Sequence, residues 1–383
     1  MSKQSFIYGF TDFKNLNSNK KSKFIDVTIT LDDLKKIISK IEFPKNQETK
    51  SSTDLICNLT DTTLCQKILS VFTNDNFLLG DKKFITQNTS FLEEKLNYFI
   101  GKDLPIEFCI MSSPFKIPVP LKTNRIFPDM GEILQLVQIQ NFCTSINSIY
   151  HKGCRVNILA EGILGKFLPI SKVEKDNYRD YISYFVDKLD YSDSIKIVDL
   201  DFIEETIPDF ENKWLQKTAE LENLLLHSNT YKSEFNSTFE SIYRIVPTTM
   251  YSNYDLQRIY NVNLDDDNLA QNQIDIRQDI KIRATKTTHN YRAFIKLRDD
   301  FKVIENRFPN VIKLTLSPKQ GNVGILPINK YSNILPYHGV AVLTKQCHFK
   351  MEYLIDLQNS GMEYKQVYFD EDKEKLPFYY CET

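Results

Sequence analysis

Glycine is scarce in this chain, and the glycine patterns that bind nucleotides are missing. The 383 residues include only 11 glycines, and no stretch reads G-x-G-x-x-G or G-x-x-x-x-G-K-[ST]. A backbone that wraps a pyrophosphate needs glycine at fixed spacing. The patterns G-x-S-x-G and H-E-x-x-H are absent as well, which removes sequence support for a serine hydrolase or a zinc protease. We therefore expect no cofactor and no metal.

Paired cysteines, long apolar runs and clustered basic charge are also lacking. The seven cysteines are scattered without C-x-x-C spacing, which is typical of a reduced chain rather than of a disulfide framework. No apolar run approaches the ~20 residues of a membrane span, and the first residues do not follow the secretion-signal pattern. Lys and Arg number 48 against 50 Asp and Glu. We expect a cytoplasmic protein that binds neither nucleic acid nor membrane.

Short apolar runs alternate with longer helical patterns along the middle of the chain. This alternation is typical of βαβ units, whose strands are buried on both faces. It predicts the α/β class, with a Rossmann-like, mostly parallel sheet flanked by helices. The expected strands are 106–111, 156–160, 195–200, 311–316 and 340–343, the expected helices 130–149 and 173–189, and a largely helical stretch 214–307.

The ends of the chain differ in composition from its middle. A helical segment near the N-terminus lies between polar stretches, and Thr30 with Asp33 forms a capping box at its start. We expect residues 1–60 to be a small peripheral element, residues 61–345 the catalytic domain, and residues 346–383 a C-terminal extension.

A second capping box is predicted within the central region. Ser90 with Glu93 is expected to begin a helix that Gly101 ends as a C-terminal cap.

Cationic residues follow the first expected strand. In open α/β sheets ligands bind beyond the carboxyl ends of the strands. Lys116, Lys122 and Arg125 occupy this position, and Asp129 begins the next helix. Cations beside a helix N-terminus can hold a phosphate or a carboxylate. The alternative is that the lysines are solvated loop residues and that Asp129 is only a helix cap.

Two acid/base candidates adjoin other strands. Glu161 follows the strand 156–160 beside a glycine, where it can act as a general base or cap a helix. His338 precedes the strand 340–343, and Gly339 would let the backbone approach a ligand closely. A purely structural histidine is the alternative.

The helical stretch from residue 282 carries further cations. Arg292 and Lys296, four residues apart, project from one helix face. Together with Arg283 they can clamp a planar anion, or they can simply face solvent. The acidic run 265–267 could bind a divalent cation, but a solvated loop explains it better.

Five segments, taken in order, resemble the isocyanide synthase family of pyoverdine and dityrosine biosynthesis. The resemblance covers roughly residues 62–345. The segments are SPFKIPVPLKTNRIFPDMGEILQL (113–136), IYHKGCRVNILAEG (149–162), IRATKTTHNYRAFIKL (282–297), FPNVIKLTLSP (308–318) and PYHGVAVL (336–343).

This resemblance implies a cytosolic enzyme with a Rossmann-like core and no nucleotide cofactor. Bacterial members of the family convert the α-amino group of an aromatic amino acid, tyrosine or tryptophan, into an isonitrile with carbon from C2 of ribulose 5-phosphate, and fungal relatives include enzymes linked to formyl-tyrosine or other isonitriles. An iron/2-oxoglutarate oxygenase is the implied pathway partner. Carried over to this sequence, the catalytic residues are Lys116, Glu161 and His338, and the substrate-binding residues are Lys122, Asp129, Arg283, Arg292 and Lys296.

The expected consequence is that replacing Lys116 or Arg283 by Ala abolishes turnover and leaves thermal stability nearly unchanged. Two segments depart from the family pattern. Glu161 stands where an aspartate is usual, and residues 287–290 replace a small residue followed by Tyr-Ser, which suggests a changed amino-acid substrate. Two other functions stay open: a methyl or glycosyl transferase, disfavoured by the missing glycine-rich turn, and a non-catalytic relative that binds a small metabolite.

Overall fold

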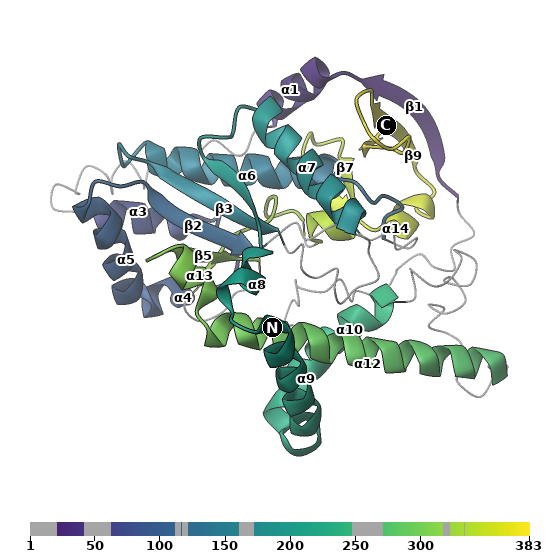
Figure 1. The fold of residues 1–383 in the computed structure, drawn as a ribbon. Coiled ribbons are helices and arrows are strands. Elements are labelled where there is room, and N and C mark those ends of the chain that lie inside the picture. Colours follow the sequence, from purple (N-terminus) through teal and green to yellow (C-terminus); the bar gives the residue numbers. More distant parts are fainter. Residues whose placement is uncertain are drawn as a thin grey trace.

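A computed structural model describes residues 21–41, 63–111, 116, 122–160, 172–246, 271–316, 322–332 and 334–383. These residues form two five-stranded sheets surrounded by helices (Figure 1). The first sheet contains β2 (Ile106–Met111), β3 (Cys154–Ala160), β4 (Ile195–Asp199), β5 (Ile312–Thr315) and β6 (Val323–Gly324). The second contains β1 (Lys23–Ile29), β7 (Val340–Leu343), β8 (Phe349–Glu352), β9 (Glu363–Phe369) and β10 (Tyr379–Glu382).

The helices of the first half of the chain are α1 (Leu31–Lys40), α3 (Leu64–Phe72), α4 (Lys82–Gln87), α5 (Thr89–Gly101), α6 (Met130–Asn147) and α7 (Lys172–Lys188). Those of the second half are α8 (Phe202–Thr206), α9 (Phe210–His227), α10 (Asn229–Ile245), α12 (Gln271–Asp300), α13 (Val303–Arg307), the 3-10 turn η4 (Pro336–His338) and α14 (Leu354–Gln358).

The first sheet has the strand order β4-β3-β2-β5-β6, and all of its pairs are parallel. The chain begins at the central strand β2, adds β3 and β4 on one side, and then returns to add β5 on the other. This is the strand order of a Rossmann-like sheet, whose direction of growth reverses between its first and fourth strands. The predicted fold class is confirmed, and so are the predicted strands of this sheet.

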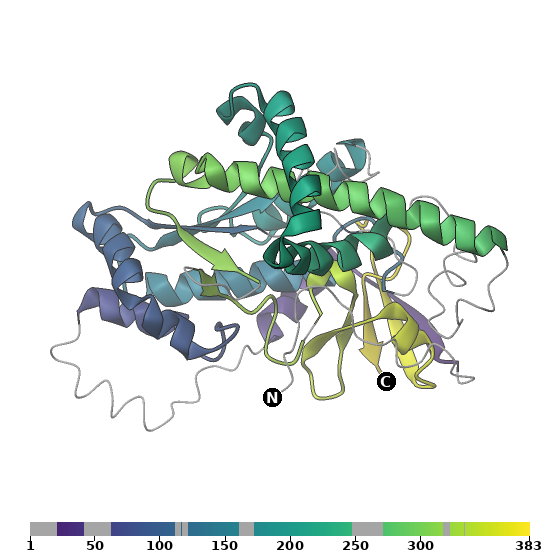
Figure 2. The same cartoon turned by 90° about the horizontal axis from the view of Figure 1, so that it is seen from below.

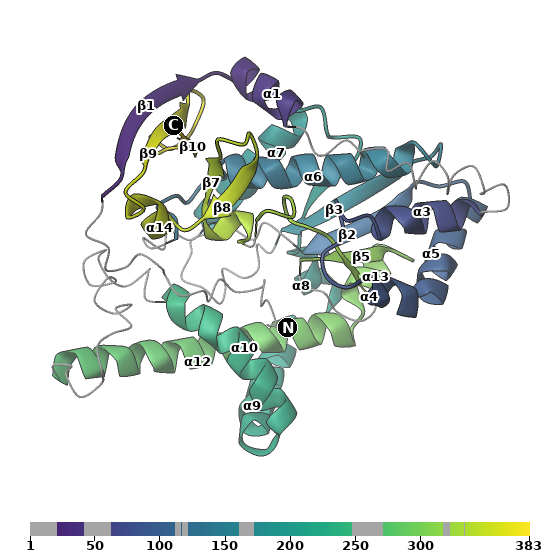
Figure 3. The ribbon, with the colours of Figure 1, turned by 180° about the vertical axis from the view of Figure 1, so that it is seen from behind.

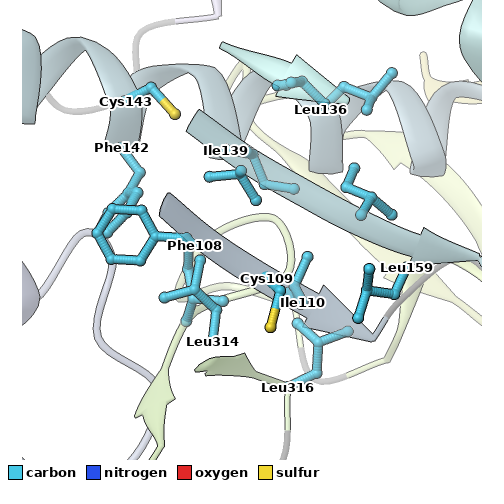
Figure 4. Close-up of a cluster of buried hydrophobic side chains, with 14 of the residues drawn as sticks. Phe108, Cys109, Ile110, Leu136, Ile139, Phe142, Cys143, Leu159, Leu314 and Leu316 are labelled. Carbon is cyan, nitrogen blue, oxygen red and sulfur yellow. The ribbon is translucent and has the colours of Figure 1, made fainter. Parts of the chain in front are cut away.

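The apolar composition of β2 follows from burial on both faces. Phe108 and Ile110 are buried, and Figure 4 shows them among side chains of α6 and of neighbouring strands. The rings of Phe108 and Phe142 of α6 meet edge to face with centroids 5.2 Å apart. Leu314 of β5 completes the contact in register with Ile110. This packing holds the start of α6 at the carboxyl ends of the strands, because a helix between parallel strands runs antiparallel to them.

The second sheet joins segments from both ends of the chain (Figure 3). Its order is β1-β9-β10-β7-β8, and β1 pairs in parallel with β9 over seven residues. The sequence analysis predicted helix α1 and its Thr30–Asp33 capping box, both of which are confirmed, but it did not predict β1. One sheet thus takes strands from all three expected segments, and the division at residues 60 and 345 stays a prediction.

The predicted helix α5 is confirmed, but both of its predicted caps are wrong. Asn88 ends α4 and also precedes α5, so Ser90 lies inside a helix that has no side-chain cap. Thr89 instead donates to the carbonyl of Ile85 in α4 at 3.1 Å, which links the two helices. Gly101 is the last helical residue, and the left-handed conformation belongs to Asp103, with φ of 53°.

Helices α9, α10 and α12 lie on the side of the first sheet away from α6 (Figures 1 and 3). The long helix α12 extends from the first sheet past the second (Figure 2). Trp214 of α9 donates from its indole nitrogen to the carbonyl of Asn290 in α12 at 3.0 Å. The prediction of a largely helical stretch is confirmed for the described part of 214–307. None of the described helices is long and apolar enough to cross a membrane.

Candidate acid–base site

Lys116 lies in a buried group of charges at the start of α6. Its ammonium nitrogen Nζ is 2.7 Å from Oδ2 of Asp129 and 3.0 Å from Oε2 of Glu132, and all three side chains are at most 2% exposed. Asp129 also caps α6, since its Oδ1 accepts the amide of Gly131 at 2.8 Å. The ammonium and the positive end of the helix dipole together compensate two carboxylates in the interior. The capping role of Asp129 is confirmed, and the solvated-loop alternative for Lys116 is wrong.

Glu132 is the titratable centre of this group. Its Oε2 accepts the amide of Asp129 at 2.9 Å, and its Oε1 accepts the hydroxyl of Tyr178 from α7 at 3.0 Å. Burial raises the pKa of Glu132 to about 7, with the charge of Asp129 adding to the rise and that of Lys116 opposing it. Burial, followed by the proximity of Glu132, raises the pKa of Tyr178 well above its ordinary value. Glu132 can therefore gain or lose a proton near neutral pH while Tyr178 stays a donor.

His338, which is half-buried, and Lys122 lie near this group. His338 ends η4, which packs against α6. Burial, together with the nearby charges of Lys122 and Lys116, lowers the pKa of His338 well below 6.5. The imidazole is thus neutral at pH 7 and can accept a proton. Lys122 is also buried, with its ammonium 5.9 Å from the ring centroid of Tyr353.

The reason expected for Gly339 is wrong. A Cβ atom at this position would lie 2.6 Å from the carbonyl oxygen of Glu352. Glycine is therefore required because β8 passes close to the backbone here, and the close approach involves a strand rather than a ligand.

Arg125 binds the C-terminal part of the protein rather than offering a free cation. Its guanidinium is fully buried, with Nη2 2.7 Å from Oδ2 of Asp372 and 3.5 Å from Oε2 of Glu374. Nη1 donates to the carbonyl of Leu376 at 2.9 Å. Nε lies 3.8 Å from Oδ2 of Asp129. Arg125 thereby ties the loop after β9 to the residue that contacts Lys116.

The three predicted cations of α12 form ion pairs, two of them with a residue of α10 and one with a residue of α12 itself. Arg292 and Lys296 do share one face, because both contact Glu234 of α10, Lys296 at 3.6 Å. The side chain of Arg283 is 58% exposed and pairs with Asp279 of the same helix at 2.9 Å. Within the described residues, no contact joins these three cations to the Lys116 group.

The altered segment 287–290 takes part in helix packing. His289 is buried, 3.3 Å from the hydroxyl of Tyr231 and with its ring centroid 4.7 Å from that of Phe235. Burial lowers its pKa below 6.5. The hydroxyl of Thr288 donates to the carbonyl of Ala284 at 2.7 Å. The contacts of His289 therefore hold α12 against α10.

Glu161 and the acidic run 265–267 lie outside the described residues. Among the residues that are described, no three His, Cys, Asp or Glu side chains are grouped as a metal ion would require.

The sequence analysis did not identify two members of the group as site residues. Glu132 follows Asp129 by three residues, and this N-cap to N3 spacing is that of a capping box, so a signal for it was present. Tyr178 had no signal, because its contact with Glu132 depends on how α7 packs beside α6.

The strand order, the buried group of Lys116, Asp129 and Glu132, and the half-buried His338 near it define a Rossmann-like α/β protein with a candidate acid–base site. The chain belongs to the family described as pyoverdine/dityrosine biosynthesis protein, which it matches over residues 96–364. This match confirms the resemblance found in the sequence.

Several relatives have named activities. The chain is 31% identical over 96 residues to the L-tryptophan isonitrile synthase AmbI1 of Fischerella ambigua, and 36% identical over 69 residues to AmbI2 of that organism. These matches cover 25% and 18% of this chain, and they span only 30% and 21% of the relatives' length. The L-tyrosine isonitrile synthase of Pseudomonas aeruginosa is 24% identical over 253 residues, which cover 64% of this chain and 72% of that protein.

The crystal structure of the PvcA protein from Pseudomonas aeruginosa has the same fold. It superposes with a TM-score of 0.63 at 19% identity, covering 84% of this chain and all of PvcA.

Proposed function

We propose that the protein is an amino-acid isonitrile synthase. It converts the α-amino group of an aromatic amino acid, tyrosine or tryptophan, into an isonitrile, with ribulose 5-phosphate as the carbon donor. One observation carries the proposal: the buried Lys116, Asp129 and Glu132 and the half-buried His338 near them come from two of the segments that resemble the family, and both lie within the matched span. The named activities of the relatives support an amino-acid substrate.

The chemistry needs groups that move protons at neutral pH. An amine that condenses with a ketone must lose protons, and the departing hydroxyl must gain one before the imine forms. The sugar must then be cleaved on both sides of C2 to release a single carbon. Neutral His338 can accept a proton, and Glu132, with a pKa of about 7, can accept or donate one. Lys116 is already paired with Asp129 and Glu132, so this ammonium is better placed to position the carboxyl group of Glu132 than to bind a phosphate.

The remaining sequence assignments belong to the same proposal. Arg283, Arg292 and Lys296 are candidates to hold the phosphate and the carboxylate, and Glu161 is a further candidate base. In the described structure the three cations are paired with Asp279 or Glu234. Substrate binding by them therefore requires that they exchange these partners.

The test is mass spectrometry of the purified protein with amino acids and ribulose 5-phosphate labelled with ¹³C at C2. An amino acid that gains one labelled carbon and loses two hydrogens supports both the reaction and the donor. An unlabelled isonitrile would refute the donor alone, and the absence of an isonitrile from folded protein would refute the function.

A matched pair of histidine variants connects the reaction to the site. His338→Gln is expected to abolish product formation, because it removes the proton acceptor. His227→Gln, at the exposed end of α9, is expected to retain full activity. Equal activity in both variants would exclude His338 from the chemistry.

We further propose that the isonitrile passes to an iron/2-oxoglutarate oxygenase and that the protein is cytoplasmic. Cell fractionation tests the location. Incubation of the product with such an oxygenase, 2-oxoglutarate and iron tests the partner, since an isonitrile left unchanged would contradict it.

A further inference from the structure

Arg298, near the end of α12, reaches the carboxyl end of β2. Its Nη1 donates to the sulfur of Met111, the last residue of β2. Its Nε and Nη2 donate to Oδ1 of Asp299 at 2.9 and 2.7 Å. The side chain of Arg298 is 12% exposed, whereas that of Asp299 is 52% exposed. One edge of the guanidinium therefore faces a solvated carboxylate, and the other faces the end of a strand.

The carboxyl end of β2 lies where the strand order of the first sheet reverses. β2 pairs with β3 on one side and with β5 on the other, so the strand order reverses between β2 and β5. In open α/β sheets, ligands bind beyond the carboxyl ends of the strands at the point of reversal. Arg298 is thus positioned where this fold binds small molecules.

The contact with Met111 leaves Arg298 with a poor hydrogen-bond partner. A thioether is a weak acceptor, and a largely buried guanidinium is stabilised much better by anionic oxygens. The planar fork of arginine matches the oxygens of phosphate and carboxylate groups. Lys116 and Arg125 cannot serve in the same way while carboxylates occupy them.

We propose that Arg298 is an anion-binding residue, with Nη1 contacting an oxygen of the phosphate or carboxylate group of a small substrate in place of the Met111 sulfur. The identity of these two anions as a sugar phosphate and an amino acid rests on the proposed function; the binding role of Arg298 does not.

Calorimetric titration of the full chain tests this role without requiring turnover. The probes are ribulose 5-phosphate against ribulose, and L-tyrosine and L-tryptophan against tyramine and tryptamine. Because a charge-assisted hydrogen bond is lost, Arg298→Gln is expected to weaken binding of one anionic ligand by roughly tenfold to a hundredfold. The counterparts that lack the phosphate or the carboxylate should bind equally to both proteins. Arg298→Lys, which keeps the charge but loses the fork, should weaken binding less.

The matched control is Arg155→Gln. Arg155 is the second residue of β3 and pairs with Glu107 at 3.5 Å, at the opposite end of the strands. The Arg155→Gln variant is expected to bind each of these ligands as tightly as the wild-type protein does. Thermal unfolding of each variant is measured alongside, so that a loss of binding is compared between folded proteins.

The outcomes show whether Arg298 binds an anionic group and, if it does, whether that group is the phosphate or the carboxylate. A loss confined to ribulose 5-phosphate identifies the phosphate, and a loss confined to an amino acid identifies the carboxylate. Unchanged affinity in Arg298→Gln would overturn the proposal. It would also be overturned by a wild-type protein that does not distinguish the ligands that bear a phosphate or carboxylate from the counterparts that lack it. If binding depends on Arg298 but no isonitrile forms, the anion-binding role of Arg298 is supported and only the proposed function is refuted.

Discussion

Replacing Glu132 by Gln should change how the stability of the protein depends on pH. Burial raises the pKa of Glu132 from 4.5 to about 7, so ionising it costs about 3 kcal/mol more in the folded protein than in the unfolded chain. Between pH 4.5 and 7 the folded protein keeps a proton that the unfolded chain has lost. The resulting stabilisation is fully present below pH 4.5 and is lost as the pH rises through about 7.

The glutamine introduced by Glu132→Gln would have nearly the same shape as the protonated carboxyl and would not titrate. At pH 5 the variant and the wild-type protein should therefore have similar free energies of unfolding. By pH 8 the variant should be the more stable of the two, by about 2 to 3 kcal/mol. Activity should fall at the same time, because the proton donor of the proposed mechanism is removed.

The assay is urea unfolding of both proteins at several pH values from 5 to 8, followed by tyrosine fluorescence and circular dichroism. Glu220→Gln, on the exposed surface of α9, is the control, and its stability should parallel that of the wild type. A difference between Glu132→Gln and wild type that stays constant from pH 5 to 8 would refute the reasoning about the buried carboxyl.

Three further predictions follow from buried contacts. Lys116→Ala should destabilise the protein by about 3 to 5 kcal/mol in urea unfolding, because it uncovers buried carboxylates; an unchanged midpoint would instead support the sequence expectation of nearly unaltered stability. Glu374→Ala should cost about 1 to 3 kcal/mol, since Ile126 and Phe127 donate their amides to this carboxylate at 3.2 and 3.1 Å, and hydrogen exchange of these two amides should accelerate. Deletion of residues 1–55 should remove β1 and expose the edge of β9, so a folded, monomeric truncation in size-exclusion chromatography would contradict the assigned role of β1.

The sequence was informative where the signal was local. Apolar runs of strand length identified β2 to β5, because burial on both faces requires such composition. Helix caps could be predicted where the capping side chain and the backbone amides that donate to it lie within three positions of each other, as at Thr30 and Asp129. Ser90 was misread because the preceding helix continues almost directly into the next, which leaves no free helix end to cap.

Contacts between distant segments could not be read in this way. β1 is mostly exposed and pairs with a strand more than 300 residues later in the chain, so its own pattern carries little sign of its partner. Arg125 was interpreted as an anion-binding cation, yet its carboxylates are supplied from within the protein by Asp372 and Glu374. Composition shows that a cation is present, but not which anion it meets.

The sequence by itself determined the α/β class, the positions of the central strands along the chain and the family, because each depends on short patterns in register along the chain. Only the tertiary structure decided which side chains work together. Lys116 contacts Asp129 and Glu132 at the start of α6. Tyr178 donates to Glu132 because α7 packs beside α6, and Arg298 contacts Met111 because α12 crosses the end of β2. The charge state of Glu132 follows from that packing, since exclusion of water, more than the residue type, sets its pKa.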